Sequence, residues 1–80
     1  MDKKVFDRSV MDKVKAVIHK KNIKQKDIAE KIGLEPSSFS RYLSDSESRC
    51  LSLYHIIKFC HITRTDLKEI LPYETPKFYL

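Results

Sequence analysis

Two cysteines and two histidines follow one another closely in the second half of the chain, at Cys50, His55, Cys60 and His61. Thiolate and imidazole groups bind zinc well, so this cluster is the first candidate for chemistry. Its spacing, Cys-x4-His-x4-Cys-His, is not a recurring arrangement of zinc ligands, and Cys60 falls on the apolar positions of an expected helix. We therefore expect no metal, no other cofactor and two thiols that stay reduced.

Catalytic groups are also missing by type and spacing. The chain has no nucleophile paired with a base, no carboxylate pair at a catalytic spacing and no glycine-rich phosphate loop. Gly33 is its only glycine, which excludes most loops of that last kind. The sequence thus predicts a protein that is not an enzyme.

The length and composition fit one small helical domain over residues 1–80. Hydrophobic residues make up 41% and charged residues 34%, which supplies enough apolar material for a packed core. One glycine and few alternating runs of Val, Ile and Thr argue against a β-sheet protein. No apolar stretch approaches the roughly 20 residues that span a bilayer, and no signal peptide is recognisable. We expect a cytoplasmic protein without membrane contact.

The net charge of +5 is concentrated in the first part of the chain. Residues 1–31 contain ten lysines and arginines against five acids, whereas residues 32–80 contain six of each. Seven of the lysines lie between positions 13 and 31. Such a cluster is most often a solvated face. Whether these lysines bind a partner therefore depends on the elements around them.

Gly33 separates two expected helices in the middle of the chain. Apolar residues at i, i+1 and i+4 mark a helix opened by Gln25, and apolar residues at i, i+3 and i+4 mark a second helix over residues 36–44. Pro36 suits the first turn of that second helix, and the glycine accepts the positive φ of a tight turn. The pattern predicts a helix-turn-helix. Its apolar positions are Ile28, Ala29 and Ile32, then Phe39, Tyr42 and Leu43.

This stretch resembles the phage Cro/repressor type of helix-turn-helix, often called the Xre-like family. In that family a Gln opens the first helix, an Ala follows four residues later and a Gly four residues after that, as Gln25, Ala29 and Gly33 do here. The resemblance extends loosely over residues 10–71. It implies an all-α, compact five-helix bundle, a lambda-repressor-like DNA-binding domain with the motif at helices two and three. The matching apolar positions are Ile28, Ile32, Leu34, Phe39 and Tyr42.

The resemblance also implies that double-stranded DNA is the partner and that the helix over residues 36–44 enters the major groove. The planar guanidinium of Arg41 can donate two hydrogen bonds to O6 and N7 of guanine. It could instead pair with Asp45 at i+4 or bind a phosphate. Glu35 could accept from cytosine N4 or serve as a favourable first-turn acid. The expected base contacts are Arg41, Ser37, Pro36 and Glu35.

In the same family, the start of the first motif helix faces the DNA backbone. Gln25 is therefore expected at a phosphate, although a capping role could hold as well, and the neighbouring lysines become a phosphate-binding surface. Lys13, Lys15 and Lys31 are expected to be solvated. The expected backbone contacts are Gln25, Lys24, Lys26, Lys21, Ser38, Ser40 and Ser44.

A first helix precedes the motif. Ser9 and Asp12 form a capping-box pattern that opens it, and it runs to about Lys21. Residues 1–8 form either an extension of this helix from near Asp2 or a loose arm. Where the family often has an arginine on the first helix paired with a glutamate after the second motif helix, this chain has Ile18 and Leu43.

Two helices follow the motif after a polar loop at residues 44–50. Thr63 and Asp66 form a capping pair that opens a short fifth helix, which Pro72 ends. Residues 72–80 form an extended or irregular tail. The fourth helix is expected to bury an apolar face made of Leu53, Ile56, Ile57 and Cys60.

Together these features predict a sequence-specific transcription regulator, a repressor, that binds DNA as a homodimer. The fifth helix and the aromatic tail are the candidates for the dimer contact, and the alternative is a tail that folds onto its own core or frays. A rival function is an antitoxin-like or accessory protein-interaction module with the same fold, and a third is DNA packaging without sequence preference. No small-molecule ligand is evident.

Overall fold

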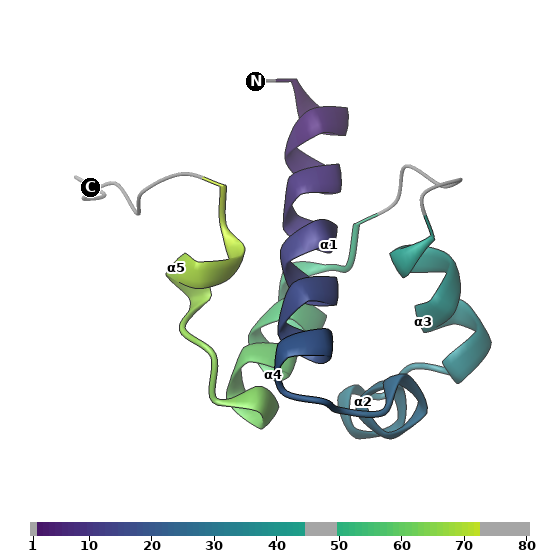
Figure 1. Ribbon diagram of the computed structural model, residues 1–80. Coiled ribbons are helices and arrows are strands. Elements are labelled where there is room, and N and C mark those ends of the chain that lie inside the picture. Colours follow the sequence, from purple (N-terminus) through teal and green to yellow (C-terminus); the bar gives the residue numbers. More distant parts are fainter. Residues whose placement is uncertain (1, 45–49, 73–80) are drawn as a thin grey trace.

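Five α-helices make up the ordered elements of the computed structural model, which describes residues 2–44 and 50–72 (Figure 1). No strand occurs within these residues, so the all-α expectation is confirmed. None of the helices in this part combines the length and the apolarity that crossing a membrane requires. The helices are α1 Lys3–Lys20, α2 Gln25–Ile32, α3 Pro36–Leu43, α4 Leu53–Thr63 and α5 Leu67–Ile70.

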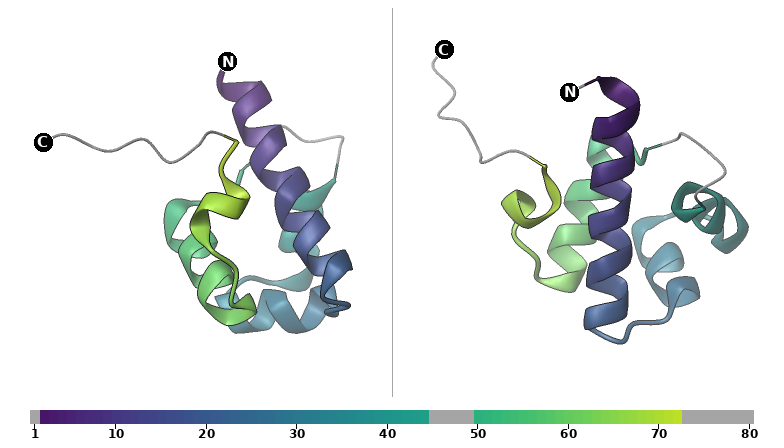
Figure 2. Two further views of the ribbon diagram at one scale, coloured as in Figure 1. Left: turned by 60° about the vertical axis from the view of Figure 1, so that its left-hand side comes forward. Right: turned by 45° about the horizontal axis from the view of Figure 1, so that its top comes forward.

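The long helix α1 stands at the centre of the molecule. Helix α3 lies on one side of it and α5 on the other, and the right-hand view of Figure 2 keeps this arrangement. Helix α2 packs against α3 and α4, while α1 packs against α3 and α5. Every helix therefore reaches a shared core, and α3 is supported from two directions.

The core is built from large side chains of all five helices. Phe39 of α3 and Phe59 of α4 are fully buried, as is Ile70 of the short helix α5. Since a packed interior has few voids, these contacts fix the helices relative to one another. The buried apolar residues are Val10, Met11, Val14, Ile28, Ala29, Ile32, Phe39, Leu43, Leu51, Ile56, Phe59, Cys60 and Ile70.

Helix α1 begins earlier than the Ser9 capping pattern predicts. The carboxylate of Asp2 caps it by accepting a hydrogen bond of 2.9 Å from the N–H of Val5. The buried carboxylate of Asp7 accepts a hydrogen bond of 2.7 Å from the ammonium of Lys3. Residues 2–8 are thus a helix extension and not a loose arm, because a good cap lies at its start.

Helix α4 buries Ile56 and Cys60 as predicted, but the predicted Leu53 and Ile57 are replaced in the buried face by Phe59 and Thr63. Leu53 and Ile57 are 65% and 51% exposed, while Phe59 is fully buried. Both faces carry apolar residues at helical spacing, so periodicity alone could not separate them. The face turned to the core consists of Ile56, Phe59, Cys60 and Thr63.

The cap of α5 is also different from the one expected. Asp66 is the N-cap, and its partner is Glu69, whose carboxylate accepts from the N–H of Asp66 at 3.0 Å. Thr63 instead ends α4, where its hydroxyl donates to the carbonyl oxygen of Phe59 at 2.7 Å. Leu71 caps the end of α5 directly before Pro72, where the sequence predicted that this helix would end.

Candidate nucleic-acid interface

The turn at Gly33 joins α2 and α3 as the sequence predicted. Gly33 has φ 86° and ψ 26°, in the left-handed region, and its N–H donates to the carbonyl oxygen of Glu30 at 3.2 Å. The N–H of Leu34 donates to the carbonyl oxygen of Ala29 at 2.8 Å. The fully buried Ala29 side chain is small enough for the two helices to approach closely. The turn is therefore fixed by hydrogen bonds at its end and by packing beneath it.

Helix α3 has one buried face and one polar face. Phe39 and Leu43 are buried, Tyr42 is half-buried, and Pro36 occupies the first turn. The helix ends at Leu43, with Ser44 as its C-cap, one residue before the expected end. The predicted contact residues Glu35, Pro36, Ser37, Ser40 and Arg41 are exposed, whereas Ser38 and Ser44 are half-buried.

The start of α2 lies near the end of α3, since Gln25 and Leu43 line the same cavity, and it presents donors and positive charge. Lys24 is the N-cap and supplies no side-chain hydrogen bond, so the first N–H groups of α2 depend on outside acceptors. Lys24, Gln25 and Lys26 are all exposed. Backbone N–H groups and the positive end of the helix dipole favour an anion at such a position.

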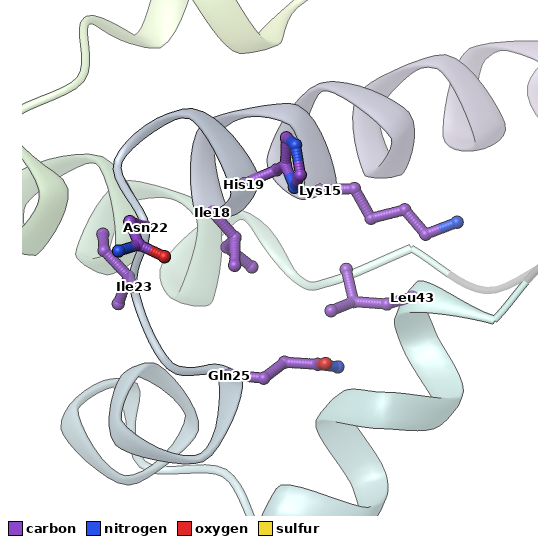
Figure 3. Close-up of a pocket in the computed structure, with 7 residues that line it drawn as sticks. All are labelled: Lys15, Ile18, His19, Asn22, Ile23, Gln25 and Leu43. Atoms are coloured by element: carbon purple, nitrogen blue, oxygen red, sulfur yellow. The ribbon is translucent and has the colours of Figure 1, made fainter.

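A cavity of about 320 Å³ lies between the end of α1, the start of α2 and the end of α3 (Figure 3). Sequence reasoning assigned Lys15 to solvent, but this residue is half-buried and lines the cavity. The sequence reading did not name His19 as a site residue, although His19 follows Lys15 by four residues and so lies on the same face of α1. The lining residues are Lys15, Ile18, His19, Asn22, Ile23, Gln25 and Leu43.

Two lysines of the basic cluster bind carbonyl groups on the other side of α1. The ammonium of Lys21 donates to the carbonyl oxygen of Thr63 at 2.7 Å, at the end of α4. The ammonium of Lys13 donates to the carbonyl oxygen of Leu71 at 3.1 Å, at the end of α5. The expectation of a solvated Lys13 is therefore wrong, and the Lys21 ammonium has a structural partner.

The cysteines and histidines do not form a shared site. Cys60 lies in the core and Cys50 is half-buried, and burial raises the pKa of both thiols, which favours their protonated form. Nδ1 of His55 lies 2.7 Å from the hydroxyl oxygen of Ser52. Within residues 2–44 and 50–72, no three His, Cys, Asp or Glu side chains are grouped as metal ligands would be.

Two of the predicted features lie outside the described residues. They are Asp45, the alternative partner of Arg41, and the aromatic side chains of the tail, Tyr73, Phe78 and Tyr79.

Comparison with known proteins supports the resemblance found in the sequence. A family model described as the Cro/C1-type HTH DNA-binding domain matches residues 13–76. Searches of curated proteins and of solved structures gave no match. The family match covers α2, the turn at Gly33 and α3, where the structure has two helices packed at a tight turn. The chain therefore belongs to the Cro/C1-type helix-turn-helix DNA-binding family.

Proposed function

We propose that this protein is a sequence-specific transcription regulator, a repressor, that inserts α3 into the major groove of double-stranded DNA. The observation that carries the proposal is the division of α3 into an anchored face and a polar face. Phe39 and Leu43 hold the helix on the core, so Ser37, Ser40 and Arg41 can face the groove. Family membership supplies the DNA partner.

Arg41 is the principal base contact in this proposal. Its guanidinium can donate two parallel hydrogen bonds to O6 and N7 of guanine, which is worth about 1 to 3 kcal/mol of discrimination between bases. Ser37 lies one turn earlier on the exposed side and reads a neighbouring base. Pro36 and Glu35 complete the edge of α3 that enters the groove first.

Contacts to the DNA backbone position α3 in the groove. Gln25, Lys24 and Lys26 bind phosphates at the uncapped start of α2. Lys21 can join them only by giving up the hydrogen bond of its ammonium to the carbonyl oxygen of Thr63. The hydroxyl groups assigned to sugar or phosphate oxygens are those of Ser38, Ser40 and Ser44.

Selection of bound sites from random double-stranded DNA tests this function. The unmodified protein should enrich a defined site, whereas Arg41→Ala should lose the preference at one base pair. Arg41→Lys is the matched variant, because it keeps the positive charge but loses the planar fork. It should retain backbone affinity and still lose that preference. An unchanged preference in both variants would remove Arg41 from base reading, and no enrichment by the unmodified protein would favour packaging without sequence preference.

Binding as a homodimer is part of the proposal. Paired half-sites match a two-fold protein dimer, and a single small domain buries little DNA surface. We place the dimer contact on α5 and on residues 73–80. Sedimentation of the protein with and without a selected site should give a dimer on the DNA, and a monomer on a paired site would contradict this arrangement.

An antitoxin-like or accessory protein-interaction module remains the second candidate, because α4 exposes large apolar side chains. Leu53, Tyr54 and Ile57 are 65%, 63% and 51% exposed. Salt dependence separates the two functions, since displacement of counterions from DNA makes the logarithm of affinity fall linearly with the logarithm of salt concentration. Lys24→Glu with Lys26→Glu should abolish a DNA affinity that Lys4→Glu, at the opposite end of α1 from α2, leaves intact. A weak salt dependence, or no effect of the first pair, would favour the protein-interaction module.

A further inference from the structure

We propose that a second cavity, between α1 and the connection from α4 to α5, binds a small organic dianion, the class that includes phosphate monoesters and dicarboxylates. The site does not depend on DNA binding, because α3 lies on the other side of α1 (Figure 1). The cavity has a volume of about 340 Å³, within the range of small-molecule sites. Its lining residues are Lys13, Ala16, Val17, Lys20, Lys21, Arg64, Thr65 and Glu69.

One wall of the cavity is a single face of α1, and the other is the segment that joins α4 to α5. Two hydrogen bonds hold these walls together. The ammonium of Lys21 donates to the carbonyl oxygen of Thr63 at 2.7 Å, and the ammonium of Lys13 donates to that of Leu71 at 3.1 Å. The cavity is therefore fixed at the end of α4 and at the end of α5.

The charges on the walls favour an anion. Four cations and a single carboxylate, that of Glu69, line the cavity. The C-terminal ends of α1 and α4 also lie here, and each acts as about half a negative charge. An excess of about two positive charges remains after both helix ends are included. A ligand with two negative charges balances this excess, whereas a neutral ligand leaves it uncompensated.

Lys20 and Arg64 are the residues that bind the ligand in this proposal. Both side chains are exposed, and neither is paired with a carboxylate in the part of the chain that the structure describes. A guanidinium offers a planar pair of N–H donors to an oxyanion, and an ammonium adds a compact positive charge. Lys13 and Lys21 hold the walls and add their charge to the site.

The remaining lining suits the body of an organic ligand better than an inorganic ion. Ala16 and the half-buried Val17 offer apolar surface on α1. One carboxylate oxygen of Glu69 accepts from the N–H of Asp66 at 3.0 Å, and the other can accept from a ligand hydroxyl. A dianion with a carbon skeleton and hydroxyl groups therefore uses more of the wall than inorganic phosphate does.

The backbone of Arg64 gives an independent indication of a binding role. Arg64 ends α4 with φ 56° and ψ 43°, in the left-handed region that glycine usually supplies at the end of a helix. Gly33 takes this conformation at the end of α2. A role for the guanidinium in binding accounts for an arginine at a position that favours glycine.

Calorimetric titration of the full chain without DNA tests the site. The probes are glucose 6-phosphate and malate, which are organic dianions with hydroxyl groups, and inorganic phosphate. We expect at least one of the organic dianions to bind saturably with one ligand per chain, and inorganic phosphate to bind more weakly. The stronger of the two organic probes identifies the phosphate or the carboxylate as the preferred anionic group. No saturable binding of either one would overturn the site, and equally strong binding of inorganic phosphate would overturn the organic ligand.

Arg64→Gly separates a binding role from a structural one, because it removes the guanidinium and relieves the left-handed backbone. It should weaken binding about tenfold, as expected for the loss of a charged hydrogen bond. Its melting temperature should stay at or above that of the unmodified protein, since glycine reaches positive φ without strain. A lower melting temperature with unchanged affinity would make Arg64 a structural residue and overturn its role as a ligand contact.

Lys20→Gln should also weaken binding. Lys4→Gln is the charge-matched control, because Lys4 lies at the opposite end of α1 and is exposed, and it should leave the affinity unchanged. Equal weakening in these two variants would show a general attraction of anions to a basic protein and overturn the site.

DNA binding by the same variants separates this inference from the proposed function. We expect Arg64→Gly to keep the affinity of the unmodified protein for its selected DNA site. A loss of DNA affinity in Arg64→Gly, without dianion binding by the unmodified protein, would assign the cavity to the DNA backbone and overturn the dianion site while the proposed function stands. Saturable dianion binding by a protein that binds no DNA would support the site and overturn only the proposed function.

Discussion

At the scale of single residues, Gly33 takes a backbone conformation that other residues reach only with strain. Its φ is 86°, yet a Cβ atom built on it would meet no heavy atom within 4 Å. The cost of a substitution therefore comes from the backbone and not from a clash. We expect Gly33→Val to lower the free energy of unfolding by about 2 kcal/mol or slightly more, because each left-handed L-residue costs about 1 to 2 kcal/mol and a β-branched side chain is less tolerant.

Gly33→Asn is the matched control for this position, since asparagine tolerates the left-handed region and adds a side chain of comparable size. It should cost clearly less than Gly33→Val in urea unfolding. DNA affinity should fall with stability in the valine variant, because the same turn sets the angle of α3. Equal stabilities of the two variants would show that the left-handed backbone is not what limits position 33.

The buried thiol of Cys60 predicts a loss of stability at alkaline pH. Burial raises its pKa above the ordinary value of 9.0. Between that value and the raised pKa, the folded protein retains the thiol proton and the unfolded chain releases it. The unfolded chain then binds fewer protons, so the free energy of unfolding falls as pH rises. Urea unfolding under reducing conditions should show a smaller fall in Cys60→Ala than in the unmodified protein between about pH 8 and pH 10. Parallel pH profiles would contradict this role for the thiol.

At the scale of elements, Lys13 of α1 and Lys21, which caps the end of α1, hold the ends of helices that are distant in sequence. Lys21 binds the last residue of α4 and Lys13 binds the residue that caps α5. A cation at a helix C-terminus satisfies a free carbonyl group and interacts favourably with the helix dipole. The basic cluster therefore has a structural part in addition to its proposed part at DNA.

We expect Lys21→Met to lower the free energy of unfolding by about 0.5 to 1 kcal/mol, the range of one hydrogen bond at an accessible site. The neighbouring Lys20→Met is the comparison, because it removes the same charge and no carbonyl contact is described for its ammonium. Chemical denaturation of both variants measures the difference. A loss that is equal in the two variants would mean that the contact with Thr63 contributes nothing to stability.

At the scale of the whole molecule, stability depends on which apolar side chains of α4 reach the common core. Phe59 is fully buried and Ile57 is 51% exposed. Phe59→Ala should cost about 3 to 5 kcal/mol, which approaches the entire stability of many small domains. Ile57→Ala should stay within about 0.5 kcal/mol, as is usual for surface changes. Thermal unfolding of the two variants tests which side chains of α4 are buried. A larger loss of stability in Ile57→Ala than in Phe59→Ala would support the face that the sequence predicted.

Much of the fold follows from local sequence signals, and those signals are strongest around the motif. Gly33 sets the turn, Pro36 the start of α3, and the apolar spacing around Phe39 the face that α3 buries. Local signals left the start of α1 open between Asp2 and Ser9, and they misassigned the cap pair of α5, because several acceptable caps compete in both segments. Asp2 caps α1 through the N–H of Val5, and Asp66 forms a capping box with Glu69, so in both helices a second local pattern is the one adopted.

The sequence by itself determined the helix-turn-helix, the polar face of α3 and the class of the fold, because turn chemistry and helical periodicity act between neighbouring residues. Only the tertiary structure decided where the lysines go and which face of α4 is buried. Lys21 and its acceptor are 42 residues apart, and Lys13 and its acceptor are 58 residues apart. A long, flexible lysine side chain binds the partner that packing brings near it. Only the packed helices therefore decide which lysines stabilise the fold and which face the proposed DNA surface.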